Sequence, residues 1–375
     1  NFREDCAQAT DQVDMTINNV RARLLAGGDV WWNLSVGRYI VPKVEPGSGQ
    51  REISSIFAGS VWIGGFDDQG NLRMAANTYR SASSNDWYPG PLDPGGETTV
   101  PQCENWDRFF RVTGEEIREH QRNMLEFGEN YNPADIPDGV KYWPGQGNQF
   151  FSERYGFELP DYPQGLGSYR DFGPGMDENN PNGIYNPLDG DYPVIQIREC
   201  PLDNFPDEMF FWIYNDAAGP HTSTQAIPIR MEVQVQAFAY ATNDEINNMT
   251  FYRYKMINRA EQSLDSAFFA MWVDGDLGCD GDDYIGCDTS LSLMLLYNED
   301  EIDGDVGSTC NCASNAPTYC NEVPILGVDY FRGPLGPKVF GSDGSLRNPN
   351  LGELPDTIVE LGMSSFTYYN RQGGP

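Results

Sequence analysis

An alternating run of apolar and polar residues in the second half of the chain constrains the fold more than any other feature. From residue 229 to residue 240, every odd position is apolar and most even positions are polar. Successive side chains of a β-strand point to opposite faces, so this period of two predicts a strand with one buried face. A turn at residues 243–245 and a second alternating run over 249–258 follow, which predicts an antiparallel partner strand.

Other short runs extend this pattern along the chain. Residues 60–79 predict a hairpin around the Asp- and Gly-containing turn 67–71. Residues 265–273 are expected to form a third consecutive antiparallel strand, which would bring the segment behind it to the rim of the sheet. A fourth strand is predicted over 291–297, and the acidic loop 298–305 follows it.

One helix is expected within this β pattern. Thr113 and Glu116 have the spacing of a capping box, and residues 117–127 contain no proline. Residues 129–206 are rich in Pro, Gly, Asn and Asp, so we expect long loops there. The predicted fold is therefore mainly β and antiparallel, similar to a β-sandwich, with long loops stapled by calcium and disulfides and few short helices.

We expect two regions along the chain. Residues 1–205 would form a hairpin- and loop-rich region with the helix, and residues 206–375 an antiparallel sandwich region. The two regions can also intertwine into one unit. Because no run approaches the roughly 18 apolar residues of a membrane helix, no membrane span is expected. The numbering also begins without a signal peptide, which is either absent or already removed.

The net charge restricts the partners. The chain has 24 Lys and Arg against 56 Asp and Glu, a formal charge of −32. This balance argues against nucleic acid or an anionic membrane surface as a partner. Hydrophobic residues at 39% and aromatics at 13% are enough for a packed core, so a folded domain carries this charge.

An aspartate-rich segment at residues 272–290 predicts a calcium site. It contains six aspartates, four glycines and two cysteines. Oxygen-only clusters suit Ca²⁺, and the glycines allow a tight loop to turn several carboxylates towards one ion. The alternative is an exposed acidic turn held by a disulfide. The candidate ligands are Asp274, Asp276, Asp280, Asp282, Asp283 and Asp288.

A second stretch, residues 178–189, follows the register of an EF-hand calcium loop. Gly183 stands at the sixth position, where a sharp turn is needed. Flanking helices are not predicted, so the alternative is a turn without an ion. The candidate ligand positions are Glu178, Asn180, Asn182, Ile184, Asn186 and Asp189.

The eight cysteines favour disulfides and an oxidising compartment over zinc, because their spacing does not match zinc motifs. The local pairs we expect first are Cys279 with Cys287, and Cys310 or Cys312 with Cys320. Connectivity does not follow from sequence alone. The remaining candidates are Cys6, Cys103 and Cys200.

Catalytic motifs are not apparent. His120 and His221 lie outside any recognisable nucleophile motif, so we expect no catalytic role for either and favour a non-enzyme. A glycosidase needs only two placed carboxylates, and the sequence singles out no pair. Aromatic pairs at 31–32, 87–88 and 142–143 either offer flat faces to sugar rings or plug loops against a sheet.

Five motifs carry a resemblance to a known family: NVRARL at 19–24, VWIGGFD at 61–67, DWYPGPL at 86–92, GIYNPLDGDYP at 183–193 and TNDEINNMTF at 242–251. Together they resemble large secreted proteins of Bacteroidota exported by the type IX secretion system, over nearly the whole chain. In that family the calcium-like loop usually has Asp where this chain has Glu178 and Asn182. The family's C-terminal sorting domain is not present in this chain.

The resemblance implies a secreted or cell-surface location and no particular reaction. We therefore expect an extracellular structural or adhesive protein (an adhesin) stabilised by calcium and disulfides. Its partners would be copies of itself, as in an extracellular filament joined by strand addition at exposed sheet edges, or other cell-surface proteins. The alternative is an extracellular carbohydrate-binding or carbohydrate-degrading protein with glycans as partners.

Overall fold

A computed structural model describes residues 5–45, 47–162, 165–197, 200–202, 204–304, 307–314, 316–337 and 358–369. The chain forms two compact units. Unit 1 consists of Asn1–Glu52 and Ile56–Asp274, and unit 2 consists of Ile53–Ser55 and Gly275–Pro375. The expected boundary at residue 205 falls inside unit 1, where β13 (Glu208–Asn215) pairs with β7 (Tyr88–Pro89) and β8 (Phe110–Thr113).

Unit 1 contains a seven-stranded sheet with the strand order β1-β2-β3-β5-β16, in which β4 also pairs with β2 and β6 with β5. The predicted hairpin at 60–79 is confirmed as β5 and β6, joined by a turn in which Asp67 accepts bonds from the backbone N–H groups of Gln69 and Asn71. The strands are β1 (Gln12–Met15), β2 (Arg21–Leu25), β3 (Asp29–Val30), β4 (Tyr39–Ile40), β5 (Ile56–Phe66), β6 (Leu72–Ala76) and β16 (Asp265–Gly275).

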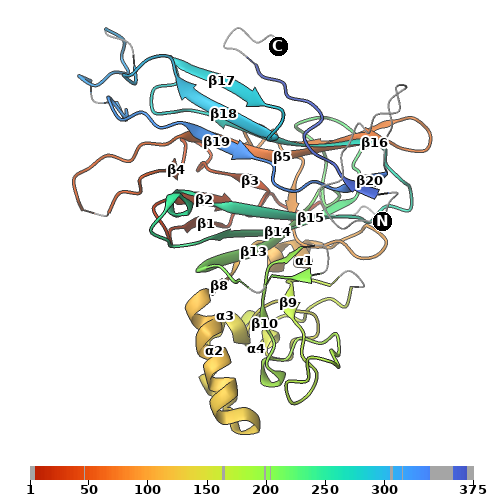
Figure 1. Cartoon of the computed structure of the whole chain (residues 1–375). Helices are drawn as coiled ribbons and strands as arrows, with labels where there is room; N and C mark the ends of the chain where they lie inside the picture. Colours follow the sequence, from red (N-terminus) through yellow and green to blue (C-terminus); the bar gives the residue numbers. More distant parts are fainter. Residues whose placement is uncertain are drawn as a thin grey trace. The chain divides into compact units, whose positions relative to one another are not determined.

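A second, five-stranded sheet of unit 1 has the order β15-β14-β13-β7, with β8 also paired to β13. The two alternating runs of the sequence are confirmed as β14 (Met231–Ala239) and β15 (Phe251–Asn258), which pair antiparallel. Every strand pair with a described register is antiparallel, so the mainly β, sandwich-like fold class is confirmed. Figure 1 shows β13, β14 and β15 side by side in green.

The strand predicted at residues 265–273 is present as β16, but it lies in the seven-stranded sheet and not beside β15. β16 joins β5 in the seven-stranded sheet and does not pair with β15. The prediction of three consecutive antiparallel neighbours was therefore wrong. An alternating pattern fixes which face of a strand is buried but not which sheet receives the strand, and sandwiches are built by connections that change sheet.

Aromatic side chains join the two sheets of unit 1. Trp31 has a positive φ of 71°, and its indole Nε1 donates to the hydroxyl of Tyr252 at 2.7 Å. Gly59 lies directly against the Trp31 ring, so a Cβ at this position would overlap it. Farther along, the rings of Tyr254 and Phe269 lie 6.3 Å apart. These contacts join the two sheets of unit 1.

The predicted helix is confirmed as α2 (Gly114–Phe127). The Thr113 hydroxyl accepts from the Glu116 backbone N–H, and the Glu116 carboxylate accepts from the Thr113 N–H at 2.8 Å. The remaining helices are short: α1 (Val100–Trp106), α3 (Asp138–Lys141), α4 (Phe151–Tyr155) and the 3₁₀ turns Gly128–Asn130, Pro133–Asp135, Pro187–Asp189 and Glu245–Asn248.

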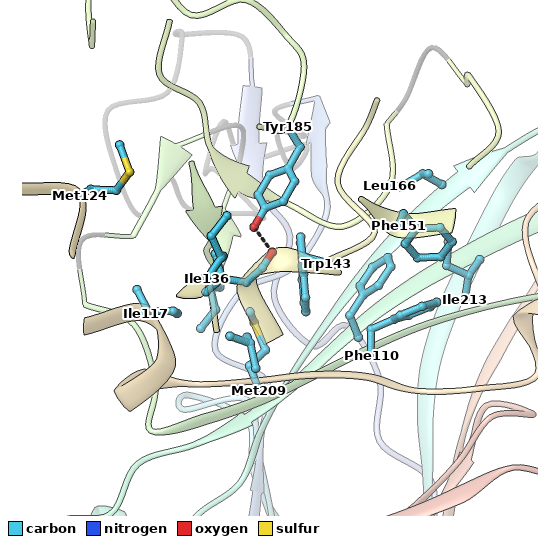
Figure 2. Packing of buried hydrophobic residues seen from close by; sticks show 14 of the residues in the cluster. Phe110, Ile117, Met124, Ile136, Trp143, Phe151, Leu166, Tyr185, Met209 and Ile213 are labelled. Atoms are coloured by element: carbon cyan, nitrogen blue, oxygen red, sulfur yellow. Dashed lines mark hydrogen bonds between the residues drawn. The ribbon is translucent and has the colours of Figure 1, made fainter. Parts of the chain in front are cut away.

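The loop-rich segment, residues 129–206, packs against the five-stranded sheet through buried aromatic residues. Phe151 and Trp143 contact the sheet residues Phe110 and Phe211 at ring distances of 5.7 Å each. The Tyr185 hydroxyl donates to the Val140 carbonyl at 2.6 Å. Figure 2 shows Tyr185 within the cluster of buried side chains that contains Trp143 and Phe151. The segment also contains two small hairpins, β9 (Tyr169–Arg170) with β10 (Tyr192–Pro193), and β11 (Gln196–Ile197) with β12 (Cys200–Pro201).

Unit 2 contains a three-stranded antiparallel sheet of β17 (Asp283–Asp288), β18 (Leu293–Asn298) and β19 (Leu326–Asp329). β18 corresponds to the predicted strand at 291–297. A further pair, β20 (Leu335–Pro337) with β21 (Ile358–Glu360), completes the described strands of this unit. In the described part of the chain, no helix is both long and apolar enough to cross a membrane.

Candidate functional site

The aspartate-rich segment divides at the start of unit 2. Residues 276–278 run beside the short segment 53–55: Asp276 N donates to the Ser55 carbonyl at 3.3 Å, and Gly278 N donates to the Ser54 carbonyl at 3.1 Å. This pairing fixes the first turn of the loop. The remainder of the loop leads into β17, which begins at Asp283.

Two of the six predicted calcium ligands, Asp274 and Asp288, form hydrogen bonds with other groups. Asp274 belongs to unit 1, where its Oδ2 accepts from the Tyr79 hydroxyl at 2.6 Å. Asp288 lies at the far end of β17 and accepts from the Ser290 N–H and hydroxyl and from the Leu291 N–H. These bonds hold the pKa of the Asp288 carboxyl below its usual value. Both carboxylates therefore accept hydrogen bonds from other groups, and Asp288 lies at the opposite end of β17 from Asp283.

Asp282 and Asp283 form the centre of the loop together with Asp303. Asp282 Oδ2 accepts from the Gly304 N–H at 2.8 Å, and Asp283 Oδ2 accepts from the Leu277 N–H at 2.9 Å. The second oxygen of each carboxylate, Oδ1, is buried without a hydrogen-bond partner. Asp303 is fully buried and accepts from the N–H groups of Cys279 and Tyr319 at 2.9 and 2.5 Å.

The acids are close enough to perturb one another. The pKa of Asp283 is raised to about 6, first by burial and then, against the bond from Leu277, by the charges of Asp282, Asp303 and Asp280. Burial also raises the pKa of Asp303, with Asp282 contributing. A buried carboxylate oxygen without a donor costs free energy unless a proton or a cation occupies the space beside it.

Sequence reasoning did not identify Asp303 as part of this cluster. It lies in the acidic loop that follows β18, more than twenty residues from Asp282. The acidic loop itself could have indicated Asp303, because the β17–β18 hairpin returns the chain to the start of the aspartate-rich segment. The Asp283–Asn298 pair at the end of the hairpin accounts for this return.

The described residues contain no group of three or more His, Cys, Asp or Glu side chains placed to hold a metal ion. Ca²⁺, however, takes six to eight oxygens that include backbone carbonyls and water. The two unpartnered oxygens of Asp282 and Asp283 are ligands of the type that calcium requires. Asp276 and Asp280, the remaining predicted ligands, have interactions of their own.

The EF-like loop in unit 1 has the predicted turn but not a converging set of ligands. Gly183 has a positive φ of 74°, as the sixth position of such a loop requires. The N–H groups of Asn182 and Gly183 point at the Asp171 carboxylate, at 3.1 and 2.8 Å. The backbone N–H groups of this loop therefore bind the Asp171 carboxylate.

The side chains of this loop are occupied elsewhere or exposed. Asn186 Nδ2 donates to Asp189 Oδ2 at 2.9 Å, and Asn182 Oδ1 accepts from the Ile184 N–H. Glu178 lies 3.9 Å from the guanidinium of Arg170. Asn180 and Ile184 are exposed.

Three disulfides are present among the described residues: Cys6–Cys103, Cys279–Cys310 and Cys312–Cys320. The expected pair Cys279–Cys287 was wrong, while Cys312–Cys320 is one of the two alternatives predicted for Cys320. Cys287 lies within β17 opposite Met294, and each strand residue advances the chain by about 3.3 Å, so the strand carries Cys287 away from Cys279. Cys200 and Cys287 are unpaired thiols.

Most of the aromatic residues considered as sugar platforms are buried, and Tyr142 is half-buried. Trp87 and Trp143 are each 1% exposed, and Trp31 and Trp32 are also buried. Their rings pack against the sheets, as Trp87 does on Tyr214 at 5.1 Å. The buried rings of Trp31, Trp32, Trp87 and Trp143 therefore plug loops against the sheets, whereas carbohydrate binding by this chain stays a prediction.

Both histidines are buried in unit 1. His221 Nδ1 and Nε2 lie 2.8 and 2.6 Å from the carbonyl oxygens of Met74 and Asp216, so neither nitrogen is available to a substrate. His120 lies on α2 and is fully buried; burial lowers its pKa to about 4 although the Asp191 and Gly190 carbonyls oppose this shift. Each ring is part of the packing of unit 1.

Comparison with protein-family models, with curated proteins and with solved structures found no match for this chain. The resemblance to secreted proteins of the type IX system therefore stays a prediction from the motifs quoted above.

Proposed function

We propose that this chain is part of a secreted, cell-surface structural or adhesive protein in which calcium and a disulfide together staple unit 2. The observation that carries the proposal is the pair of buried, unpartnered oxygens on Asp282 and Asp283. Bringing a divalent cation to this cluster removes the repulsion between the carboxylates and supplies the missing partners. We assign this site a structural role, since its carboxylates accept hydrogen bonds from the backbone of unit 2.

Location outside the cell is supported by the cysteines and by the charge. Disulfides persist in oxidising compartments, and the three pairs of this chain include two within unit 2. A net charge of −32 keeps a surface solvated and repels anionic partners. Both features fit a protein that works beyond the cytoplasm.

Self-assembly by strand addition is supported by β16. This strand ends the order of the described strands in its sheet, and its first residues are exposed, including Phe268 at 65%. An exposed apolar edge is a template for a strand from another chain. Electron microscopy of native cell surfaces tests this part: filaments that react with an antibody to this chain support assembly, and isolated particles contradict it.

The calcium claim is tested by melting the protein in EDTA and in excess Ca²⁺. All eight tryptophans lie in unit 1, so tryptophan fluorescence follows that unit alone. Hydrogen exchange of β17, β18 and β19 follows unit 2. EDTA is expected to lower the melting temperature of unit 2 and to leave the tryptophan transition unchanged; identical exchange of unit 2 with and without chelator contradicts the claim.

A further inference from the structure

One side of the three-stranded sheet of unit 2 is apolar and exposed; Figure 1 shows the three strands side by side in blue. Tyr284 on β17 and Tyr297 on β18 are register partners, so their side chains lie on the same face of the sheet. Their rings stack at a centroid distance of 6.0 Å with an interplanar angle of 22°, and the two residues are 48% and 41% exposed. Ile325, directly before β19, is 72% exposed. We call the side that carries Tyr284 and Tyr297 the tyrosine face.

Two glycines leave the backbone of the tyrosine face bare next to the tyrosines. Gly286 and Gly327 are the register partners of Leu295, one on each side. Among the described residues, a Cβ at Gly286 would meet only the Tyr297 ring, at 3.6 Å. Because a glycine in a strand allows another chain to approach closely, this row can receive the side chains of a partner.

Two carboxylates lie at the other end of the tyrosine face. Leu293 pairs with Asp288 on one side and with Asp329 on the other. In the part of the chain that the structure describes, neither carboxylate forms an ion pair. The surrounding sequence is acidic as well, since residues 275–337 contain twelve Asp and Glu and one basic residue, Arg332. A cationic group therefore complements this end of the face, whereas a second copy of the unit would be repelled.

We propose that the tyrosine face docks an extended segment of a partner protein in which apolar residues precede or follow a lysine or arginine. Residues 293 and 297 are four positions apart on β18, which corresponds to about 13 Å at the rise of a strand. An extended partner segment has the same rise and presents alternate side chains to one face. Its first side chain would cover the tyrosines, its third would cover Leu295, and its fifth, a basic one, would reach Asp288 and Asp329.

The chemistry of the tyrosine face favours such a segment over a sugar. The aliphatic stem of a lysine or arginine packs along apolar surface while its charged head reaches a carboxylate, and a cation is also attracted to a tyrosine ring. A neutral glycan would contact the rings but gain no attraction from Asp288 and Asp329. The inference goes beyond the proposed structural role and does not use the cation site, because Asp283 lies on the opposite face of β17 from Tyr284.

The first experiment selects peptides from a random display library on the intact, immobilised chain. We expect the enriched peptides to carry Lys or Arg four positions from an aromatic or aliphatic residue, in either chain direction. An acidic protein attracts basic peptides in general, so the spacing and not the charge is the criterion. A selection that enriches no peptide, or only peptides without this spacing, overturns the inference.

The second experiment measures the affinity of the most enriched peptide by fluorescence anisotropy. In Tyr284→Ala/Tyr297→Ala the dissociation constant should rise about tenfold or more, because exposed aromatic residues dominate such contacts. In Asp288→Asn/Asp329→Asn it should rise about fivefold, as expected for two ion pairs at a surface. Equal affinities of the native chain and of the folded tyrosine variant overturn the inference.

The matched control is Glu301→Gln/Glu322→Gln. It removes the same charge as the aspartate variant at two exposed residues outside the three strands, and the affinity should stay unchanged. A loss in this control equal to that of Asp288→Asn/Asp329→Asn overturns the inference, because the attraction would then come from the general charge of the chain.

A glycan array and sedimentation velocity test the other occupants of the tyrosine face. Glycan binding or dimer formation that Tyr284→Ala/Tyr297→Ala abolishes, with no peptide bound, assigns the face to that occupant and overturns the inference. Failure of the face leaves Ca²⁺ binding to the oxidised chain unchanged, so it is distinguishable from failure of the proposed function.

Discussion

Replacing Gly278 by alanine tests the geometry of the acidic cluster most sharply. Gly278 has a positive φ of 82°, and a Cβ built there overlaps Asp303 Oδ2. Two losses of stability therefore add in this variant. A left-handed backbone costs an alanine about 1–2 kcal/mol, and forcing atoms into a packed site costs typically 1–3 kcal/mol. The variant is expected to lose about 2–5 kcal/mol of the free energy of unfolding of unit 2.

Gly307 supplies the matched control for this substitution. It lies in the same unit with a φ of 92°, and a Cβ there meets no atom within 4 Å. Gly307→Ala should therefore cost only the backbone term, about 1–2 kcal/mol. Urea unfolding followed by hydrogen exchange of β17 to β19 gives both values in EDTA. Equal losses for the two variants would refute the reasoning that Gly278 is required by Asp303.

Four further predictions concern other parts of the chain. Removing the aromatic plug with Trp143→Ala should cost about 3–5 kcal/mol of unit 1 stability, measured by urea unfolding, because Trp143 is 1% exposed and packs on Phe211; a loss below 1 kcal/mol contradicts the packing. Thr113→Ala removes the capping box of α2 and should cost about 1 kcal/mol in the same assay, while an unchanged midpoint argues against the cap. Burial raises the pKa of Asp191 to about 7. This carboxyl therefore stabilises unit 1 fully below pH 3.8, and that contribution is lost as the pH rises through about 7. In Asp191→Asn the corresponding fall in unfolding free energy with pH should vanish, and its persistence would contradict the assignment. His120 has the opposite sign, because its depressed pKa gives stability above pH 6.5 that is lost as pH falls through about 4, so His120→Gln should flatten an upward slope over that window.

Local signals in the sequence predicted the elements they encode. The capping box at Thr113 and Glu116 gave the start of α2, and the alternation over 229–240 gave β14, because each signal involves neighbouring residues on one element. The turn around Asp67 likewise predicted the β5–β6 hairpin.

Long-range pairing was not predictable in the same way. The sequence of β16 has no feature that distinguishes pairing with β15 from pairing with β5, since both partners accept an alternating strand. The same limit applies to the cysteines, because Cys279 reaches Cys310 only after the β17–β18 hairpin has formed. Asp303 enters the candidate site by that route too, so a scan for nearby acids selected Asp274 and Asp288 in its place.

The central claim is that Asp282 and Asp283 bind a calcium ion that stabilises unit 2. Its most direct test is a calorimetric titration of Ca²⁺ into the chelator-treated, oxidised chain and into two variants, Asp282→Asn/Asp283→Asn and Asp274→Asn. Asp274 serves as the control because its carboxylate bonds to Tyr79 in unit 1. The account predicts binding to the native chain and to Asp274→Asn, and its loss in the double variant. Binding of equal affinity to all three proteins, or to none of them, would contradict it.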